Sequence, residues 1–402
     1  MPALSQRATV IQPSPTLLLD SEAKTMKAQG LDVVNLSIGE PDFPTPTHIG
    51  QAAIEAIKAG FTKYTATEGI LPLREAIAEK FKKDNNLDYG PANIVVSAGG
   101  KHALYNAFQC LCQPGDEVII PSPYWVTYPA QAILAGAQPV FAPMDPERLV
   151  LTPEGLKSVL SPRSKVLVIN SPSNPTGGLF SPEDLAKLAP IIKKANLWVI
   201  SDDIYESLVY DDAPFANLAM VAPELKDQVV IAHGVSKSYS MTGWRVGYLA
   251  APLAVAQAAT KLQSQMTSNV ASLAQKAALA ALTESQEPVA QMRAAFNERR
   301  LKVLALLKDF PQWTTPQPQG AFYVFPNISS LLGQTLGDVL IQDSNDLAQV
   351  LLRKTWVATV PGSAFGSPNH LRFSYAASLE DLERGLGRIR DFLTHKPFSL
   401  GS

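Results

Sequence analysis

Residues 165–206 read KVLVINSPSNPTGGLFSPEDLAKLAPIIKKANLWVISDDIYE, and this stretch decides the fold class. It contains two short runs of mostly branched apolar residues, at 165–172 and 197–203, and a segment with helical spacing, 182–195, between them. Near-continuous apolar strands that alternate with helices are typical of a parallel sheet covered on both faces. The stretch therefore predicts a strand–helix–strand unit of an α/β protein.

Similar apolar runs lie on both sides of this unit, at 94–100, 117–123 and 228–237. Together they predict one mainly parallel sheet flanked by helices. From about Ser285 the pattern changes, because a long charged helical segment leads into GAFYVFPNI and later into HLRFSYA. We therefore expect a large domain and a smaller α+β domain, with the large domain over 46–284 and the small one formed by 1–45 and 285–402.

Composition narrows the class of protein. The 402 residues are 46% hydrophobic and 17% charged, and the net charge is −2. This balance is that of an ordinary globular protein, and it provides no basic field for nucleic acid or an acidic membrane. No apolar run is long enough to cross a bilayer, and the N-terminus shows no cleavable signal. The two cysteines, Cys110 and Cys112, lack the spacing of a metal site. We expect a cytoplasmic enzyme without a metal, a nucleic-acid partner or a membrane partner.

Polar residues follow several of the predicted strands. Ligands of parallel sheets bind beyond the carboxyl ends of the strands, so these residues should converge on one crevice. They are Gly99, Gly100, Lys101, Tyr124, Trp125, Asn174, Asp202, Tyr205, Ser236 and Lys237.

Each of these features also has a simpler interpretation. Gly99 and Gly100 before a helix suit an anion at the helix N-terminus, but they also suit a plain tight turn. Asp202 fits the cap of a following helix, and Trp125 fits an ordinary core. Single motifs therefore do not establish a function here.

The order and spacing of the whole set resemble the fold type I enzymes that depend on pyridoxal phosphate, specifically the class I/II aspartate aminotransferase family. The resemblance covers almost the whole chain. It is carried by GEPDF (39–43), YTATEGILPLREA (64–76), SAGGK (97–101), SPYW (122–125), NSPSNPTG (170–177), SDDIYE (201–206), SKSYSMTGWRVGY (236–248) and LRFSYA (371–376). It implies an aminotransferase of amino acid metabolism with pyridoxal 5'-phosphate as cofactor.

The resemblance also implies roles around the cofactor ring. Lys237 bonds covalently to the cofactor aldehyde, and a lysine in this role needs a lowered pKa. Asp202 faces the pyridine nitrogen and keeps it protonated, so that the ring accepts electrons. Asn174 and Tyr205 donate hydrogen bonds to the ring oxygen, and Trp125 stacks on the ring. The catalytic residues are thus expected to be Lys237, Asp202 and Tyr205.

The cofactor phosphate is expected at Arg245 and Ser236, together with the backbone of Gly99 and Gly100. Arginine suits a phosphate because its planar fork bonds two oxygens at once. In the family a tyrosine of the neighbouring subunit also reaches the phosphate, and Tyr64 matches it. The resemblance therefore implies a homodimer with shared active sites.

Arg372 matches the arginine that grips the substrate α-carboxylate. An arginine between Leu371 and Phe373 in a strand is costly unless an anion pairs with it, although an intramolecular salt bridge is the other interpretation. Gly39 approaches the substrate through its backbone, and the small domain closes over the substrate in family members. Trp125 and Asn174 are also expected to contact the substrate.

Two branches of the family differ in the residue that binds the second carboxylate of the substrate. One branch uses an arginine of the partner subunit, and this chain has Ser264 at the matching position. The other branch uses a lysine directly after the two glycines, with hydroxyls from a Ser-x-Thr near the N-terminus. Lys101, Ser14 and Thr16 match this second branch. We therefore expect aspartate or glutamate as the amino donor and a 2-oxo acid as acceptor. A phosphate contact or a solvated position is the other interpretation of Lys101.

Other functions remain open at this point. Prephenate is an alternative acceptor, and aromatic, alanine or kynurenine specificity follows if Lys101 points elsewhere. A C–S lyase or a synthase on the same fold would use the same cofactor motifs. A regulator with an aminotransferase-like domain would carry a DNA-binding domain before GEPDF, and a nucleotide-binding protein would carry a Walker pattern, which SAGGK lacks.

Overall fold

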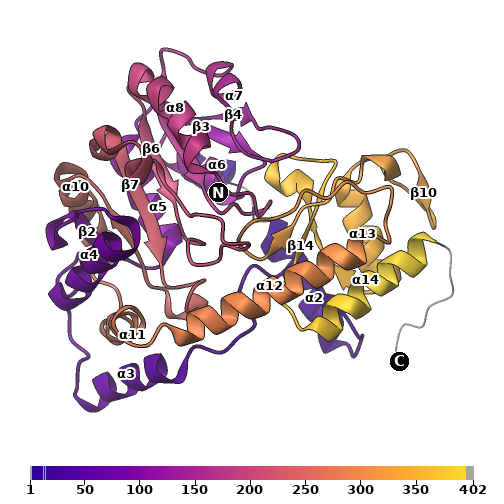
Figure 1. The fold of residues 1–402 in the computed structure, drawn as a ribbon, viewed down its shortest axis with the longest axis horizontal. Coiled ribbons are helices and arrows are strands. Elements are labelled where there is room, and N and C mark those ends of the chain that lie inside the picture. The colour runs from indigo at the N-terminus through magenta and orange to yellow at the C-terminus, as the bar shows by residue number, and fades with distance from the viewer. Residues whose placement is uncertain (1, 12, 14, 395–402) are drawn as a thin grey trace.

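The computed structural model describes residues 2–11, 13 and 15–394. It contains a large sheet with helices on both faces and a smaller group of strands and helices beside it (Figure 1). The long helix α12 (Glu287–Leu307) runs from the first part to the second. In the part of the chain that the structure describes, no helix combines the length and the apolar character that a membrane span requires.

The large sheet has seven strands in the order β2-β8-β7-β6-β5-β3-β4. Their bounds are β2 (Ile94–Ser97), β3 (Glu117–Ser122), β4 (Gln138–Pro143), β5 (Ser164–Asn170), β6 (Trp198–Asp202), β7 (Val229–Gly234) and β8 (Gly247–Ala250). The pairs from β7 through to β4 are parallel, and β8 runs antiparallel to both of its neighbours. The mainly parallel sheet predicted from the sequence is confirmed, whereas β4 and the reversed strand β8 were not predicted.

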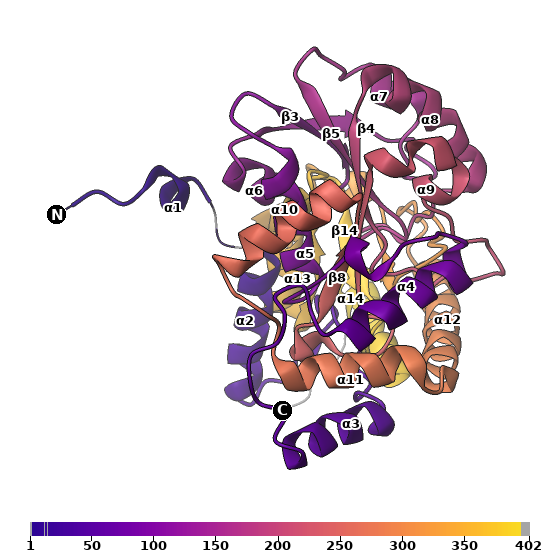
Figure 2. The same ribbon diagram turned by 90° about the vertical axis from the view of Figure 1, so that its left-hand side faces the viewer.

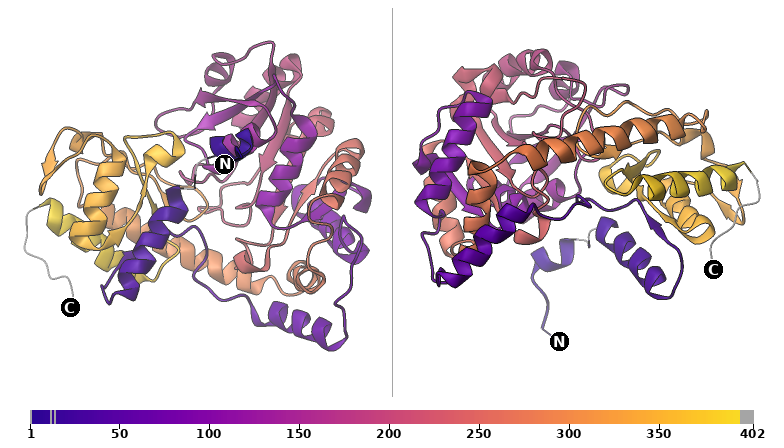
Figure 3. Two further views of the ribbon diagram at one scale, coloured as in Figure 1. Left: turned by 180° about the vertical axis from the view of Figure 1, so that it is seen from behind. Right: turned by 60° about the horizontal axis from the view of Figure 1, so that its bottom comes forward.

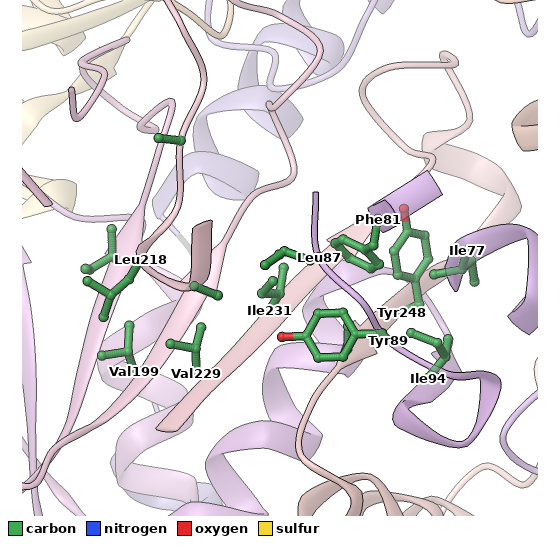
Figure 4. Close-up of a cluster of buried hydrophobic side chains, with 14 of the residues drawn as sticks. Ile77, Phe81, Leu87, Tyr89, Ile94, Val199, Leu218, Val229, Ile231 and Tyr248 are labelled. Atoms are coloured by element: carbon green, nitrogen blue, oxygen red, sulfur yellow. The ribbon is translucent and has the colours of Figure 1, made fainter. Parts of the chain in front are cut away.

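Alternate residues of each strand face opposite sides of the sheet. In β5, Val166 and Val168 pack with α5 (Gly100–Leu111), α6 (Thr127–Leu134) and α10 (Leu253–Ser264). Leu167 and Ile169 pack on the other side with α3 (Thr47–Lys58), α4 (Leu71–Asn85), α8 (Pro182–Ala195) and α11 (Ser272–Thr283). Figure 4 shows part of this second cluster, including Phe81. Full burial of each such side chain contributes about 1.5–3 kcal/mol, so the two clusters hold the sheet rigid.

The smaller part is built on the strands β13 (Val360–Pro361), β14 (Leu371–Ser374) and β9 (Tyr323–Val324), which pair antiparallel in that order. Beside them, β1 (Val34–Asn35) pairs parallel with β12 (Val357–Ala358). The helices α13 (Ser344–Thr355) and α14 (Leu379–Leu393) cover these strands, and α2 (Pro15–Ala28) lies against β12 and β13 (Figure 3). Residues near the N-terminus therefore associate with the C-terminal part of the chain, and the domain boundaries at 46 and 284 stay a prediction.

The remaining elements are short. They are α1 (Gln6–Val10), which projects from the body of the molecule in Figure 2, α7 (Pro153–Lys157), α9 (Leu218–Val221), and a hairpin of β10 (Thr335–Leu336) with β11 (Val339–Leu340). Single 3-10 turns lie at Pro91–Asn93, Pro223–Gln228, Thr242–Trp244, Ser329–Leu331 and Gly362–Phe365.

Candidate active site

A cavity of about 460 Å³ lies where the carboxyl ends of the parallel strands face the smaller part of the molecule. Most of the residues predicted from the sequence line it. They are Gly39, Gly100, Lys101, Trp125, Asn174, Asp202, Tyr205, Ser236, Lys237, Arg245 and Arg372. The convergence expected from the strand ends is therefore present.

Five predicted residues are not in this lining. Tyr124 is one of them, although its neighbour Trp125 lines the cavity. Gly99 lies directly behind it, against the guanidinium of Arg245. Tyr64 is 90% exposed and lies outside the cavity of its own chain, so its predicted contact with a partner's phosphate stays a prediction. Ser14 lies outside the described residues, and Thr16 falls in α2 with a side chain that is not described.

Lys237 lies three residues after β7, at the base of the cavity. Burial lowers the pKa of its ammonium group to about 8, with the nearby Arg372 and Arg245 acting in the same direction and Glu40 acting against them. Its Nζ donates a hydrogen bond to the backbone oxygen of Gly39 at 2.5 Å. A lysine with a pKa this low is readily deprotonated near neutral pH, as a nucleophile or general base requires.

Asp202 is the last residue of β6 and is 4% exposed. Burial raises the pKa of this carboxyl above its ordinary value, and hydrogen bonds oppose that rise. The hydroxyl of Tyr128 donates to Oδ2 at 2.7 Å, and the backbone N–H of Ile204 donates to Oδ1 at 3.3 Å. A turn at 204–207 follows β6, so Asp202 does not cap a helix there. Its carboxylate instead faces the cavity.

Arg372 lies in β14 and is 3% exposed. Its Nη1 donates to Oδ1 of Asn174 at 2.9 Å, and its Nη2 donates to the backbone oxygen of Ser37 at 2.7 Å. Its Nε has no hydrogen-bond partner among the described residues, and burial lowers the pKa of the guanidinium. Among the described residues no carboxylate forms an ion pair with it, so the salt-bridge interpretation is wrong here. A buried cation with an unused donor suits a ligand carboxylate.

The turn between β2 and α5 is shaped to receive a phosphate. Gly99 has φ +86°, and a Cβ at this position would lie 2.4 Å from Nη2 of Arg245. The arginine is held by a hydrogen bond from its Nη1 to the backbone oxygen of Thr242 at 2.8 Å. The positive end of α5 and a guanidinium therefore meet at one place, which favours an anion.

Lys101 lies in the first turn of α5, where its Nζ is 5.1 Å from the ring centre of Trp125. Burial lowers the pKa of Lys101, and the charge of Arg245 lowers it further. The ammonium group is thus placed beside the ring that is expected to stack on the cofactor.

The structure adds cavity residues that the sequence analysis missed. Tyr128 and Tyr323 line it, and charged residues of α2 and of the GEPDF segment, Asp20, Lys24 and Glu40, lie at its edge. Tyr128 follows SPYW by three residues, and that spacing could have indicated it. Tyr323 lies within the apolar run GAFYVFPNI, where nothing distinguishes it from core residues.

These residues fit pyridoxal phosphate. The cradle of Gly99, Gly100 and Arg245 suits its phosphate, Asp202 suits its ring nitrogen, and the low pKa of Lys237 suits its aldehyde. The Nε of Arg372, which has no partner among the described residues, is available to donate to the carboxylate of a substrate.

Known proteins that are similar to this chain are aminotransferases. The chain is 46% identical over 391 residues to the aspartate aminotransferase of Geobacillus stearothermophilus. The aligned residues cover 97% of this chain and 98% of that protein. It is also 46% identical over 395 residues to the aspartate/prephenate aminotransferase of Cereibacter sphaeroides, covering 98% and 99%. Both relatives match the chain over nearly its whole length.

Solved structures also match the chain over nearly its whole length. The aspartate aminotransferase from Rhizobium meliloti superposes with a TM-score of 0.93 at 38% identity, covering 97% of this chain and 98% of that one. The Thermus thermophilus aspartate aminotransferase with maleate gives 0.91 at 39% identity, covering 98% and 100%.

A family model described as aminotransferase class I and II matches residues 31–389. The predicted fold type, the pyridoxal phosphate cofactor and the aminotransferase class are thereby confirmed. The chain belongs to the class I and II aminotransferases.

Proposed function

We propose that this enzyme moves the amino group of aspartate to 2-oxoglutarate, and that of glutamate to oxaloacetate, in a homodimer with shared active sites. The observation that carries the proposal is one cavity that holds Lys101, a lysine of low pKa, Lys237, and an arginine, Arg372, that has no carboxylate partner in the part of the chain that the structure describes. The names of the relatives as aspartate aminotransferases support it.

The residues of the chain divide the work of the reaction. Bound pyridoxal phosphate supplies the aldehyde that takes up the amino group and a ring that accepts electrons. Arg372 binds the α-carboxylate and so orients the Cα–H bond toward Lys237. The neutral amine of Lys237 removes the proton from Cα and returns it. Asp202, whose carboxylate accepts a hydrogen bond from the hydroxyl of Tyr128, holds a proton at the ring nitrogen.

Lys101 is proposed to bind the second carboxylate of the substrate, with Ser14 and Thr16 assisting. Its position beside Trp125 supports this, because a substrate held at Arg372 lies in the same cavity. Prephenate is a second candidate acceptor, since it also bears two carboxylates and the Cereibacter sphaeroides relative is named an aspartate/prephenate aminotransferase.

Three further features belong to the proposal. Tyr64 reaches the phosphate of the partner's site, and its 90% exposure leaves it available for such a contact. The small domain, residues 1–45 and 285–402, closes over the large domain, 46–284, to exclude water. We also propose a cytoplasmic location, and two free cysteines suit a reducing compartment.

The test is to supply the purified enzyme, loaded with pyridoxal phosphate, with aspartate and 2-oxoglutarate. We expect oxaloacetate and glutamate to form in equal amounts. A C–S lyase would form no glutamate here, because aspartate has no C–S bond; from a sulfur-containing amino acid it would release a thiol, a 2-oxo acid and ammonia. Products in unequal amounts, or a substantially higher kcat/KM for an aromatic donor than for aspartate, would contradict the proposal.

A further inference from the structure

Tyr323 contacts several parts of the proposed site at once. It is fully buried in β9 and lines the cavity. Its hydroxyl lies 2.8 Å from the hydroxyl of Tyr205, and its ring centre lies 4.5 Å from Cζ of Arg372. A Cβ at Gly39 would lie 3.3 Å from the same hydroxyl, so Tyr323 also supports the segment that accepts the hydrogen bond of Lys237.

The contact with Tyr205 determines where that hydroxyl points. The two rings meet edge to face, with centres 5.9 Å apart and an interplanar angle of 83°. Tyr323 provides the one hydrogen bond that the hydroxyl of Tyr205 makes within the described part of the chain. Without it, the hydroxyl of Tyr205 would be free to rotate, and its hydrogen bond to a ligand would be less well oriented.

The contact with Arg372 offsets the cost of burying a cation. The guanidinium lies over two rings, that of Tyr323 at 4.5 Å and that of Phe365 at 5.0 Å. Its hydrogen bonds go to neutral oxygens, those of Asn174 and Ser37. The ring faces therefore supply the remaining electrostatic support and fix the plane of the fork.

We propose that Tyr323 is a positioning residue for the reaction, whose hydroxyl orients Tyr205 and whose ring face orients Arg372. The inference rests on the proposed function, since it concerns the cofactor and carboxylate partners assigned there. Because two different parts of one side chain are involved, two substitutions separate the two effects.

The hydroxyl is tested with Tyr323→Phe, which keeps the ring. The near-visible absorbance of the cofactor held at Lys237 is titrated with pH. When the hydroxyl of Tyr205 donates to the cofactor, its hydrogen bond with Tyr323 is one that it accepts. A hydroxyl that accepts a hydrogen bond also donates a stronger one, so Tyr205 becomes a weaker donor in the variant. We expect the midpoint to rise, by at most about 0.4–1 pH unit, which is the equivalent of losing one whole neutral hydrogen bond. The titratable and charged groups that face Tyr205 and Lys237 include Glu40, Tyr128, Asp202, Arg245, Tyr323 and Arg372, and all of these but Tyr323 are unchanged.

The ring face is tested with Tyr323→Leu and with the affinity for maleate, a dicarboxylate that has no amino group to transfer. Loss of the cation–π contact should raise the maleate Kd by about 2- to 30-fold, whereas Tyr323→Phe should leave it within about twofold of the wild type. If thermal denaturation shows that Tyr323→Leu does not fold, Tyr323→Met takes its place, because its longer, flexible side chain fills irregular gaps.

The matched control is Tyr375→Phe, which removes a buried hydroxyl bonded to the backbone oxygen of Ala321, outside the cavity lining. It should change neither the midpoint nor the maleate Kd. The inference is overturned if Tyr323→Phe titrates with the wild-type midpoint, or if the variant without the ring binds maleate as the wild type does. Transamination of aspartate by the wild-type protein is measured alongside the variants. A wild type without this activity would contradict the proposed function, independently of what the Tyr323 variants show.

Discussion

Replacing Lys101 by alanine tests how the enzyme recognises the second carboxylate. The substitution removes the ammonium group beside Trp125 and leaves Arg372 in place. A lost charged hydrogen bond costs about 1.5–3 kcal/mol, which corresponds to a decrease of about 10- to 150-fold in kcat/KM for aspartate. We expect the lower half of this range, because the side chain of Lys101 is exposed to solvent, which weakens its electrostatic interactions. Alanine has no second carboxylate, so its kcat/KM should change by less than about threefold.

The assay follows the first half-reaction alone, through the absorbance change of the bound cofactor when aspartate or alanine is added without an acceptor. This avoids 2-oxoglutarate, which also carries two carboxylates. The matched control is Lys276→Ala, since Nζ of Lys276 also lies over an aromatic ring, that of Phe61 at 4.8 Å, but outside the cavity. Equal losses for aspartate and alanine in Lys101→Ala would refute the reasoning.

Two further predictions concern buried polar groups near the site. Tyr128→Phe removes a donor to Asp202, so the pKa of Asp202 should rise further, and the acidic limb of the kcat/KM profile should move to higher pH; an unchanged limb in a pH-rate measurement would contradict this. For Glu206, burial opposes ionisation, but the hydrogen bond from His233 and the charge of Lys80 bring its pKa down to about 2. A carboxyl whose pKa is lowered in the folded state stabilises the fold at pH values above its ordinary pKa, 4.5, and no longer does so below its folded pKa, about 2. Glu206→Gln should therefore lower the free energy of unfolding by about 3 kcal/mol at pH 7, and by progressively less as the pH falls from 4.5 toward 2. Denaturant unfolding at several pH values measures this, and a pH-independent difference would count against it.

The sequence predicted the sheet and most of the site because both rest on local patterns. Buried parallel strands such as β5 and β6 are continuous apolar runs, and the residues at their ends follow from where parallel strands end. The strand β8 was not predicted at all, because it is only four residues long, and its antiparallel direction could not have been read from so short a run.

Side-chain neighbours far apart in the sequence were also beyond prediction. Tyr323 meets Tyr205 across 118 positions, and the apolar pattern around it is that of any buried strand. The predicted contact of Tyr64 depends on a second copy of the chain, and the contributions of Ser14 and Thr16 depend on side chains that the structure does not describe.

The most direct test of the central claim is the rate of transamination by Lys237→Ala. The wild-type enzyme with pyridoxal phosphate should convert aspartate and 2-oxoglutarate through repeated turnovers, with near-visible absorbance that shifts when aspartate is added. Because Lys237 both binds the cofactor and moves the proton at Cα, its loss should lower kcat by about 10²–10⁴-fold or more. A Lys237→Ala enzyme that transaminates at the wild-type rate without added amine would contradict the account.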